Sequence, residues 1–154
     1  MNLPLAYFRW WQMLLLGLGL TIFPWAGWAD VPQELHTAEE IRRLSPTEAD
    51  RRYPVRIRGI ITFFDDRIPA HSFRFIQDDT AGIYYYVDGS PNNPTCKVGQ
   101  MVEIQGVTGA GSFAPVITAQ STRILGEGKL PEPKSVPLED LVSGREDSQF
   151  VEVR

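Results

Sequence analysis

The sequence predicts a mainly β domain in which five short strands close into a small barrel. Three observations favour this class. Apolar and polar residues alternate with period two, as in residues 53–64. Glycine, proline and aspartate, which favour turns, separate the alternating stretches. No long helical pattern interrupts them.

Two short helical turns precede the strands, within a lead-in at residues 30–52. Thr37 and Glu40 have the spacing of a capping box, in which each side chain accepts a bond from the other residue's backbone amide. Ser45 stands before Pro46, and proline is favoured at the first helical position, so a second turn is expected there.

The strands themselves are expected at residues 53–64, 72–77, 83–87, 101–107 and 115–125. Gly59 inside the first strand indicates a bend or a bulge. Further along that strand, the alternation predicts that Phe63 faces inward and Phe64 outward. The inward apolar positions predict a core of Val55, Ile57, Ile61, Phe75, Ile83, Tyr85, Val87, Val102 and Ile104.

The order of these strands indicates the architecture. A long first strand, a hairpin, a loop and a second hairpin predict a five-stranded OB-like Greek-key barrel at residues 53–126, with the short helical turns in front. A sandwich of strands and turns is the alternative. We expect residues 127–143 to be a proline-containing linker, because Pro131 and Pro133 favour extended chain.

The last residues, 144–154, are expected to begin a truncated second module. Residues 150–154 repeat the alternation that opens the first strand, and Glu139-Asp140-Leu141 follow Glu39-Glu40-Ile41 by a hundred positions. We therefore expect the chain to be the N-terminal part of a longer protein. Because one short strand has no independent stability, residues from about Gly126 onward are expected to be loosely held.

Residues 1–29 have the pattern of a signal peptide. Arg9 precedes an apolar run at residues 13–23, and small residues follow at Gly27 and Ala29, which predicts cleavage before Asp30. An uncleaved signal anchor is the alternative, because residues 10–29 are about long enough to span a bilayer. Either way, the rest of the chain is expected outside the cytoplasm.

Charge and cysteine content restrict the function further. Residues beyond 29 hold 14 basic and 19 acidic side chains, a net charge of −5. This charge argues against nucleic acid as a partner, since its phosphates require a basic surface. The single cysteine, Cys96, has no disulfide partner within the chain, and we expect a buried structural thiol.

Three stretches of the chain resemble a known family. Residues 53–65, residues 75–84 and residues 98–109 are similar to tandem OB-like modules at the N-terminal, extracytoplasmic end of bacterial membrane sensor proteins, often histidine kinases. The resemblance implies a place on the periplasmic or extracellular side of the inner membrane. It also implies a following OB-like module or signalling domain as partner, with membrane attachment beyond the C-terminal end or through an uncleaved N-terminal segment.

A candidate ligand-binding face follows from the barrel prediction. OB barrels usually bind on the face of strands two and three, beside the loops that flank them. Five residues are candidates for this face: Arg56, Arg58, Tyr84, Tyr86 and Phe113. The alternative is that the tyrosines cover the barrel or contact a neighbouring module, because exposed aromatic residues occur in interfaces of every kind.

Other polar groups are better explained by structure than by chemistry. Six residues invite a metal or acid–base interpretation: Asp65, Asp66, Asp78, Asp79, His36 and His71. The aspartate pairs suit turns, and neither histidine has a ligand cluster beside it. The glycine-rich residues 106–111 lead to a strand rather than a helix, which favours a hairpin over a phosphate loop.

We therefore expect no catalytic residue, metal or cofactor. The leading hypothesis is a non-catalytic binding or sensory module of a larger membrane signal-transduction protein, with a small ligand of unknown identity. The alternatives are a structural spacer that stacks on a following module, and an OB domain that binds oligonucleotides or oligosaccharides.

Overall fold

The computed structural model describes residues 33–65, 73–87, 89 and 92–154, all within the unit Val31–Arg154. The expected signal peptide, with its cleavage site before Asp30, lies outside the described residues, as do Asp66 and His71. Within the described part, no helix is long and apolar enough to cross a membrane.

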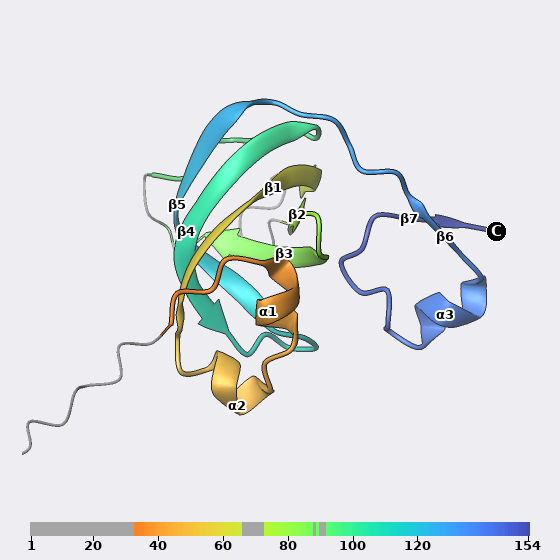
Figure 1. The fold of residues 1–154 in the computed structure, drawn as a ribbon, viewed down its shortest axis with the longest axis horizontal. Coiled ribbons are helices and arrows are strands. Elements are labelled where there is room, and N and C mark those ends of the chain that lie inside the picture. Colours follow the sequence, from red (N-terminus) through yellow and green to blue (C-terminus); the bar gives the residue numbers. More distant parts are fainter. Residues whose placement is uncertain (1–32, 66–72, 88, 90–91) are drawn as a thin grey trace, which may run out of the picture. The chain divides into compact units, whose positions relative to one another are not determined.

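Five strands close into a barrel, as Figure 1 shows. Their order around the barrel is β1-β2-β3-β5-β4, and β4 returns to β1. The contact between β3 and β5 is parallel, and the other pairings are antiparallel. This arrangement confirms the OB-like Greek-key barrel and excludes the sandwich. The strands are β1 (Pro54–Asp65), β2 (Phe73–Gln77), β3 (Gly82–Val87), β4 (Gln100–Gly109) and β5 (Val116–Glu127).

The helical lead-in is tied to the barrel by hydrogen bonds and by its apolar side chains. It forms α1 (Ala38–Arg42), which begins with the expected capping box, and α2 (Pro46–Ala49), where Ser45 and Glu48 form a second capping box that was not predicted. Asp78, in the turn after β2, accepts a 2.8 Å hydrogen bond from the Ala38 amide. The fully buried Ile41 joins the barrel core, so the lead-in is part of the folded module.

One bulge in β1 changes which side chains face inward. Pairing with β2 shifts between Ile61 and Phe63, so that Thr62 is an extra residue. Phe63 is consequently 47% exposed, whereas Phe64 packs against the core. The predicted orientations of these two phenylalanines are therefore wrong.

The core is otherwise close to the expected one. The fully buried residues include the predicted Val55, Ile57, Ile61, Ile83, Tyr85, Val102 and Ile104. Phe75 is an error, because β2 turns Ile76 and Arg74 inward and leaves Phe75 on the outer face. The Arg74 guanidinium lies 4.9 Å from the centre of the Phe64 ring, a cation–π contact that helps to accommodate its charge.

A glycine allows two strands of the barrel to approach closely. At Gly106, a side chain would place its Cβ 2.1 Å from the Thr118 carbonyl oxygen, so β4 and β5 approach closely only because this residue is glycine.

Cys96 is buried as expected, and burial raises the pKa of its thiol above the ordinary value. A thiol in this state is a poor nucleophile, which fits a structural role.

Beyond the barrel, the chain repeats the arrangement of its lead-in. A parallel two-stranded sheet joins β6 (Lys134–Val136) to β7 (Val151–Val153), with α3 (Leu138–Val142) between them. In the lead-in, Leu35 likewise forms a parallel bridge to Val55 in β1, and α1 lies between them. The predicted linker thus contains β6 and α3. Residues from about Gly126 onward were expected to be loosely held. Hydrogen bonds that join Gln149 and Phe150 to the barrel do not fit a loosely held segment.

The buried Ile57 provides a test of the core. Truncation to alanine leaves a cavity in a site that is 0% exposed, so we expect Ile57→Ala to lower the free energy of unfolding by about 2–5 kcal/mol. Denaturant unfolding measures this change. The exposed Val142 provides the control, and Val142→Ala should change stability by less than about 0.5 kcal/mol. Equal stability of Ile57→Ala and the wild type would contradict the placement of Ile57 in the core.

Candidate ligand-binding surface

Aromatic side chains form a continuous row on the outer face of β1, β2 and β3. Ring centres are 6.0 Å apart for Phe63 and Phe75, 5.4 Å for Phe75 and Tyr84, and 6.3 Å for Tyr84 and Tyr86. The strand register explains the row, because Phe75 pairs with Phe63 on one side and with Tyr84 on the other. We call the following set the aromatic surface: Phe63, Phe73, Phe75, Tyr84, Tyr86 and Phe113.

The aromatic surface is accessible to solvent. Phe113, on the loop between β4 and β5, is 76% exposed, and Phe73 and Tyr86 are exposed by 48% and 40%. Partial burial raises the pKa of the Tyr84 phenol above its ordinary value, so this ring stays neutral. A group of uncharged rings on a protein surface commonly marks an interaction site.

Two adjoining hollows lie over the aromatic surface. One, of about 440 Å³, is lined by rings of β2 and β3 and by Phe113. The other, of about 400 Å³, is lined by Phe63 and by residues 149–151. Phe75, Asp147 and Ser148 line both, so the hollows form one groove. Its far wall, residues 147–151, comes from the C-terminal segment, and we call this stretch the wall segment.

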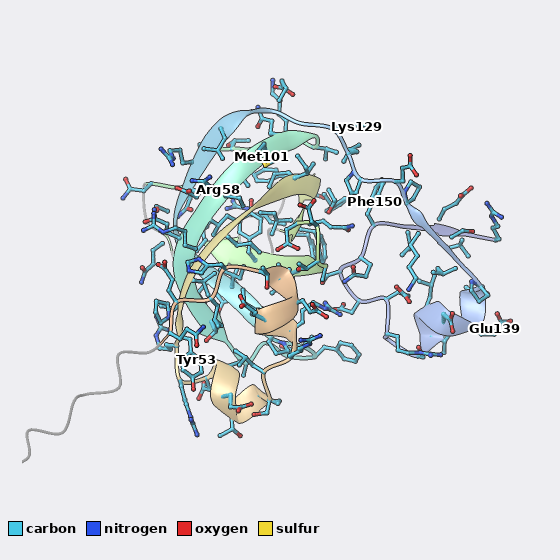
Figure 2. All side chains as sticks on the ribbon, in the orientation of Figure 1. Tyr53, Arg58, Met101, Lys129, Glu139 and Phe150 are labelled. Atoms are coloured by element: carbon cyan, nitrogen blue, oxygen red, sulfur yellow. The ribbon has the colours of Figure 1, made fainter. Side chains whose placement is uncertain are left out.

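The predicted arginines lie elsewhere. Arg58 donates a 2.8 Å hydrogen bond to Glu103, and Arg56 lies 3.6 Å from Glu34. Both arginines line a separate hollow beside His36 and Asp78. The five predicted residues therefore do not form one site. The reason is register: β1 pairs with β4 over residues 54–60 and with β2 over residues 60–65, so its arginines and its aromatic end face different neighbours. Figure 2 shows Arg58 over β1 and β4, away from Phe150.

Glu103 holds two arginines on that side of the barrel. It pairs in register with Arg58 on β1 and with Arg123 on β5, and its side chain is only 2% exposed. The Arg123 guanidinium lies 2.7 Å from its second oxygen. Hydrogen bonds from Arg58 and then Arg123 hold the pKa of the Glu103 carboxyl below its ordinary value of 4.5. Both cations are thus engaged away from the aromatic surface.

Two of the remaining candidates, Asp78 and His36, make structural contacts. Asp78 accepts hydrogen bonds from the Thr80 and Ala81 amides at 2.8 and 2.9 Å, which confirms that it forms a turn. The His36 ring nitrogen Nδ1 lies 3.2 Å from the Arg56 carbonyl oxygen. Across the residues that the structure describes, no three acidic, histidine or cysteine side chains cluster as metal ligands would.

Sequence reasoning missed most of the groove lining. The missed residues include Phe63, Phe73, Phe75, Asp147 and Ser148. The alternation of Phe73 and Phe75 beside that of Tyr84 and Tyr86 was the available signal for a shared face. Phe63 was hidden by the bulge, and no local pattern connects residues 147 and 148 to strands sixty positions earlier.

Comparison with known proteins adds little about function. No family model and no curated protein matches the chain. It is similar to asparaginyl-tRNA synthetase from Pyrococcus horikoshii complexed with asparaginyl-adenylate, with 17% identity over 63% of this chain and 24% of that chain (TM-score 0.49). The hypothetical protein ygiW from E. coli is 22% identical over 59% of this chain and 89% of that chain (TM-score 0.44).

A third structure, OBody AM1L10 bound to hen egg-white lysozyme, is 18% identical over 62% of this chain and 97% of that chain (TM-score 0.46). The chain thus spans about a quarter of the length of the synthetase, 24%. At these identities and TM-scores, no ligand or activity follows from the likeness.

The Glu103 cluster predicts a dependence of stability on pH. Because the folded-state pKa of Glu103 is lowered, its stabilising effect is complete above the unfolded value near 4.5 and is lost as pH falls through the folded value. We expect Glu103→Gln to lower the melting temperature at neutral pH and the difference from wild type to shrink below about pH 4.5. Thermal unfolding across this range, with Glu152→Gln as a surface control, measures the effect. A difference that is constant with pH would contradict the assignment.

Proposed function

We propose that the chain is a non-catalytic binding module and that the aromatic surface is its ligand-binding face. The observation that carries the proposal is a group of six neutral rings, four of them in a row, that lies at the protein surface and lines a groove. Leaving so much aromatic area in water has a free-energy cost, because burying the rings would be favourable. A ligand that covers them recovers that free energy.

Charge argues against nucleic acid as this ligand. Residues beyond 29 have a net charge of −5. In addition, among the residues that the structure describes, Asp147 is the one charged residue that lines the groove. Stacked bases would suit the rings, but a phosphate backbone needs lysine or arginine beside them.

We further propose a sensory place for the module, on the periplasmic or extracellular side of a bacterial inner membrane and ahead of a second OB-like module or a signalling domain. The family resemblance supports this place. A structural repeat supports it as well. Leu35, α1 and β1 of the lead-in have the same order and parallel pairing as β6, α3 and β7, which is what a lead-in to a second barrel would have.

A structural spacer is the second candidate, favoured by one observation. The wall segment already docks on the barrel through Gln149 and Phe150, as a stacking contact between modules would. A spacer and a binding module differ in one measurable respect. Truncating an exposed ring weakens ligand binding by a binding module while its barrel stays folded, whereas a spacer has no ligand to lose.

A ligand panel tests the proposed function. Single-stranded DNA, neutral oligosaccharides, basic peptides and proline-rich peptides are each titrated against the wild-type chain and against Tyr86→Ala and Phe113→Ala. We expect at least one uncharged or cationic ligand to bind, and each ring truncation to weaken it about tenfold, equivalent to about 1.4 kcal/mol.

The control for the panel is Arg56→Ala, which removes an exposed side chain outside the groove. Circular dichroism establishes that each variant is folded. Binding that is equally strong in all four proteins, or binding of DNA that Arg56→Ala alone abolishes, would contradict the aromatic surface as the ligand face.

A further inference from the structure

The aromatic groove is a composite, and its second wall is held on the barrel by the Gln149 side chain, together with the Phe150 amide and Arg42. Gln149 accepts a 3.0 Å hydrogen bond from the Gly82 amide and donates a 3.2 Å bond back to the Gly82 carbonyl. The Gln149 side chain thus satisfies both backbone groups of a residue at the start of β3. The Phe150 amide adds a 2.9 Å bond to Gln77, the residue that pairs with Gly82 across the hairpin.

This contact is specific to the residues present. A Cβ at Gly82 would lie 2.1 Å from the Ser148 carbonyl oxygen, so the wall segment reaches the barrel only because residue 82 is glycine. Ser148 has a φ of 61°, in the left-handed region that a non-glycine residue seldom adopts. Arg42, from α1, approaches both sides of the contact, lying 3.2 Å from the Gly82 carbonyl and 3.6 Å from Asp147.

We propose, as a deepening of the proposed function, that the groove between the aromatic surface and the wall segment binds an uncharged oligosaccharide, and that Gln149 positions Asp147 and Ser148 as part of the site. Sugar rings present apolar C–H faces that pack on aromatic rings and hydroxyl edges that bond to polar side chains. The groove offers both, since neutral rings form its floor and Asp147, Ser148, Ser112 and Thr62 lie around it.

Charge and shape select this class of ligand. Within the described part of the chain, Asp147 is the one charged group in the lining, and its negative charge disfavours phosphate, sulfate and carboxylate. Each hollow has the volume of a small-ligand site, about 300–1,000 Å³. Because two hollows of about 440 and 400 Å³ share three lining residues, a chain of several units fits better than a single ring.

The sheet also disfavours a peptide that binds by strand addition. Such a peptide needs a free strand edge, and β1, β2 and β3 each pair with a strand on both sides. A proline-rich peptide needs no edge, so it is kept as an outcome of the test.

The test uses calorimetric titration of the full chain with uncharged hexasaccharides that differ in linkage and sugar, namely cellohexaose, chitohexaose, maltohexaose and mannohexaose. We expect at least one to bind. Gln149→Ala should weaken it tenfold or more, because both bonds to Gly82 are lost and the wall segment is held less firmly against the barrel. Gln120→Ala, an exposed glutamine on β5 outside the groove, is the matched control and should bind as wild type does.

Amide hydrogen exchange gives a second measurement that does not depend on a variant. Saturating hexasaccharide should slow exchange at Gly82 and Phe150, whose amides bond to the two glutamines of the contact. It should leave the exposed β7 residue Glu152 unchanged. If Gln149→Ala does not fold, this measurement alone decides the composite groove.

The outcomes separate this inference from the proposed function. Sugar binding that Tyr86→Ala weakens but Gln149→Ala does not, with unchanged exchange at Gly82 and Phe150, overturns the composite groove and leaves the binding module standing. Binding of a proline-rich peptide through the same rings, with no sugar bound, overturns the ligand class only. If no ligand depends on the rings at all, the proposed function fails as well.

Discussion

A single extra residue in β1 determines the outer surface of this barrel. Thr62 shifts the register between Ile61 and Phe63, and from that point the strand exchanges its inner and outer faces. Phe63 moves outward to meet Phe75, whose own partner is Tyr84, and so a row of rings is continuous across three strands. Without the bulge, Phe63 would face the core and the row would begin one strand later.

The charges of the module are arranged so that this surface stays neutral. Arg58 and Arg123 share the carboxylate of Glu103 on the β1, β4 and β5 side, and Arg42 is directed to Asp147 and to the backbone at Gly82. The same Gly82 is bound by Gln149, so the β2–β3 hairpin is where the lead-in, the barrel and the C-terminal segment meet. The groove is therefore built by parts of the chain far apart in sequence, and its described lining carries one charged side chain, Asp147.

The sequence predicted the features that depend on local pattern. The capping box of α1, the five strands, the buried Cys96 and the outward tyrosines of β3 are each specified by residues within a few positions of one another. The sequence-based prediction was wrong where contact with a neighbouring strand determines which way a side chain points. Whether Phe75 or Ile76 is buried depends on the Thr62 bulge and on Phe64, which receives the Arg74 guanidinium. Arg56 and Tyr84 do not meet, because β1 pairs with β4 at Arg56 and pairs with β2, the neighbour of β3, only from Ile60 onward. The role of Gln149 depends on a contact across 67 positions, which no local pattern encodes.

We propose that a ligand binds in the groove, between the rings on one side and the wall segment on the other. Two-dimensional NMR of the isotope-labelled full chain, titrated with an uncharged hexasaccharide, locates the bound ligand. We expect shift changes in the rings of Tyr84, Tyr86 and Phe113 and in the amides of Asp147 and Ser148, while Arg56 and Arg58 are unaffected. Changes confined to Arg56, Arg58 and His36 would contradict it, because the ligand would then occupy the charged hollow on the other side of β1.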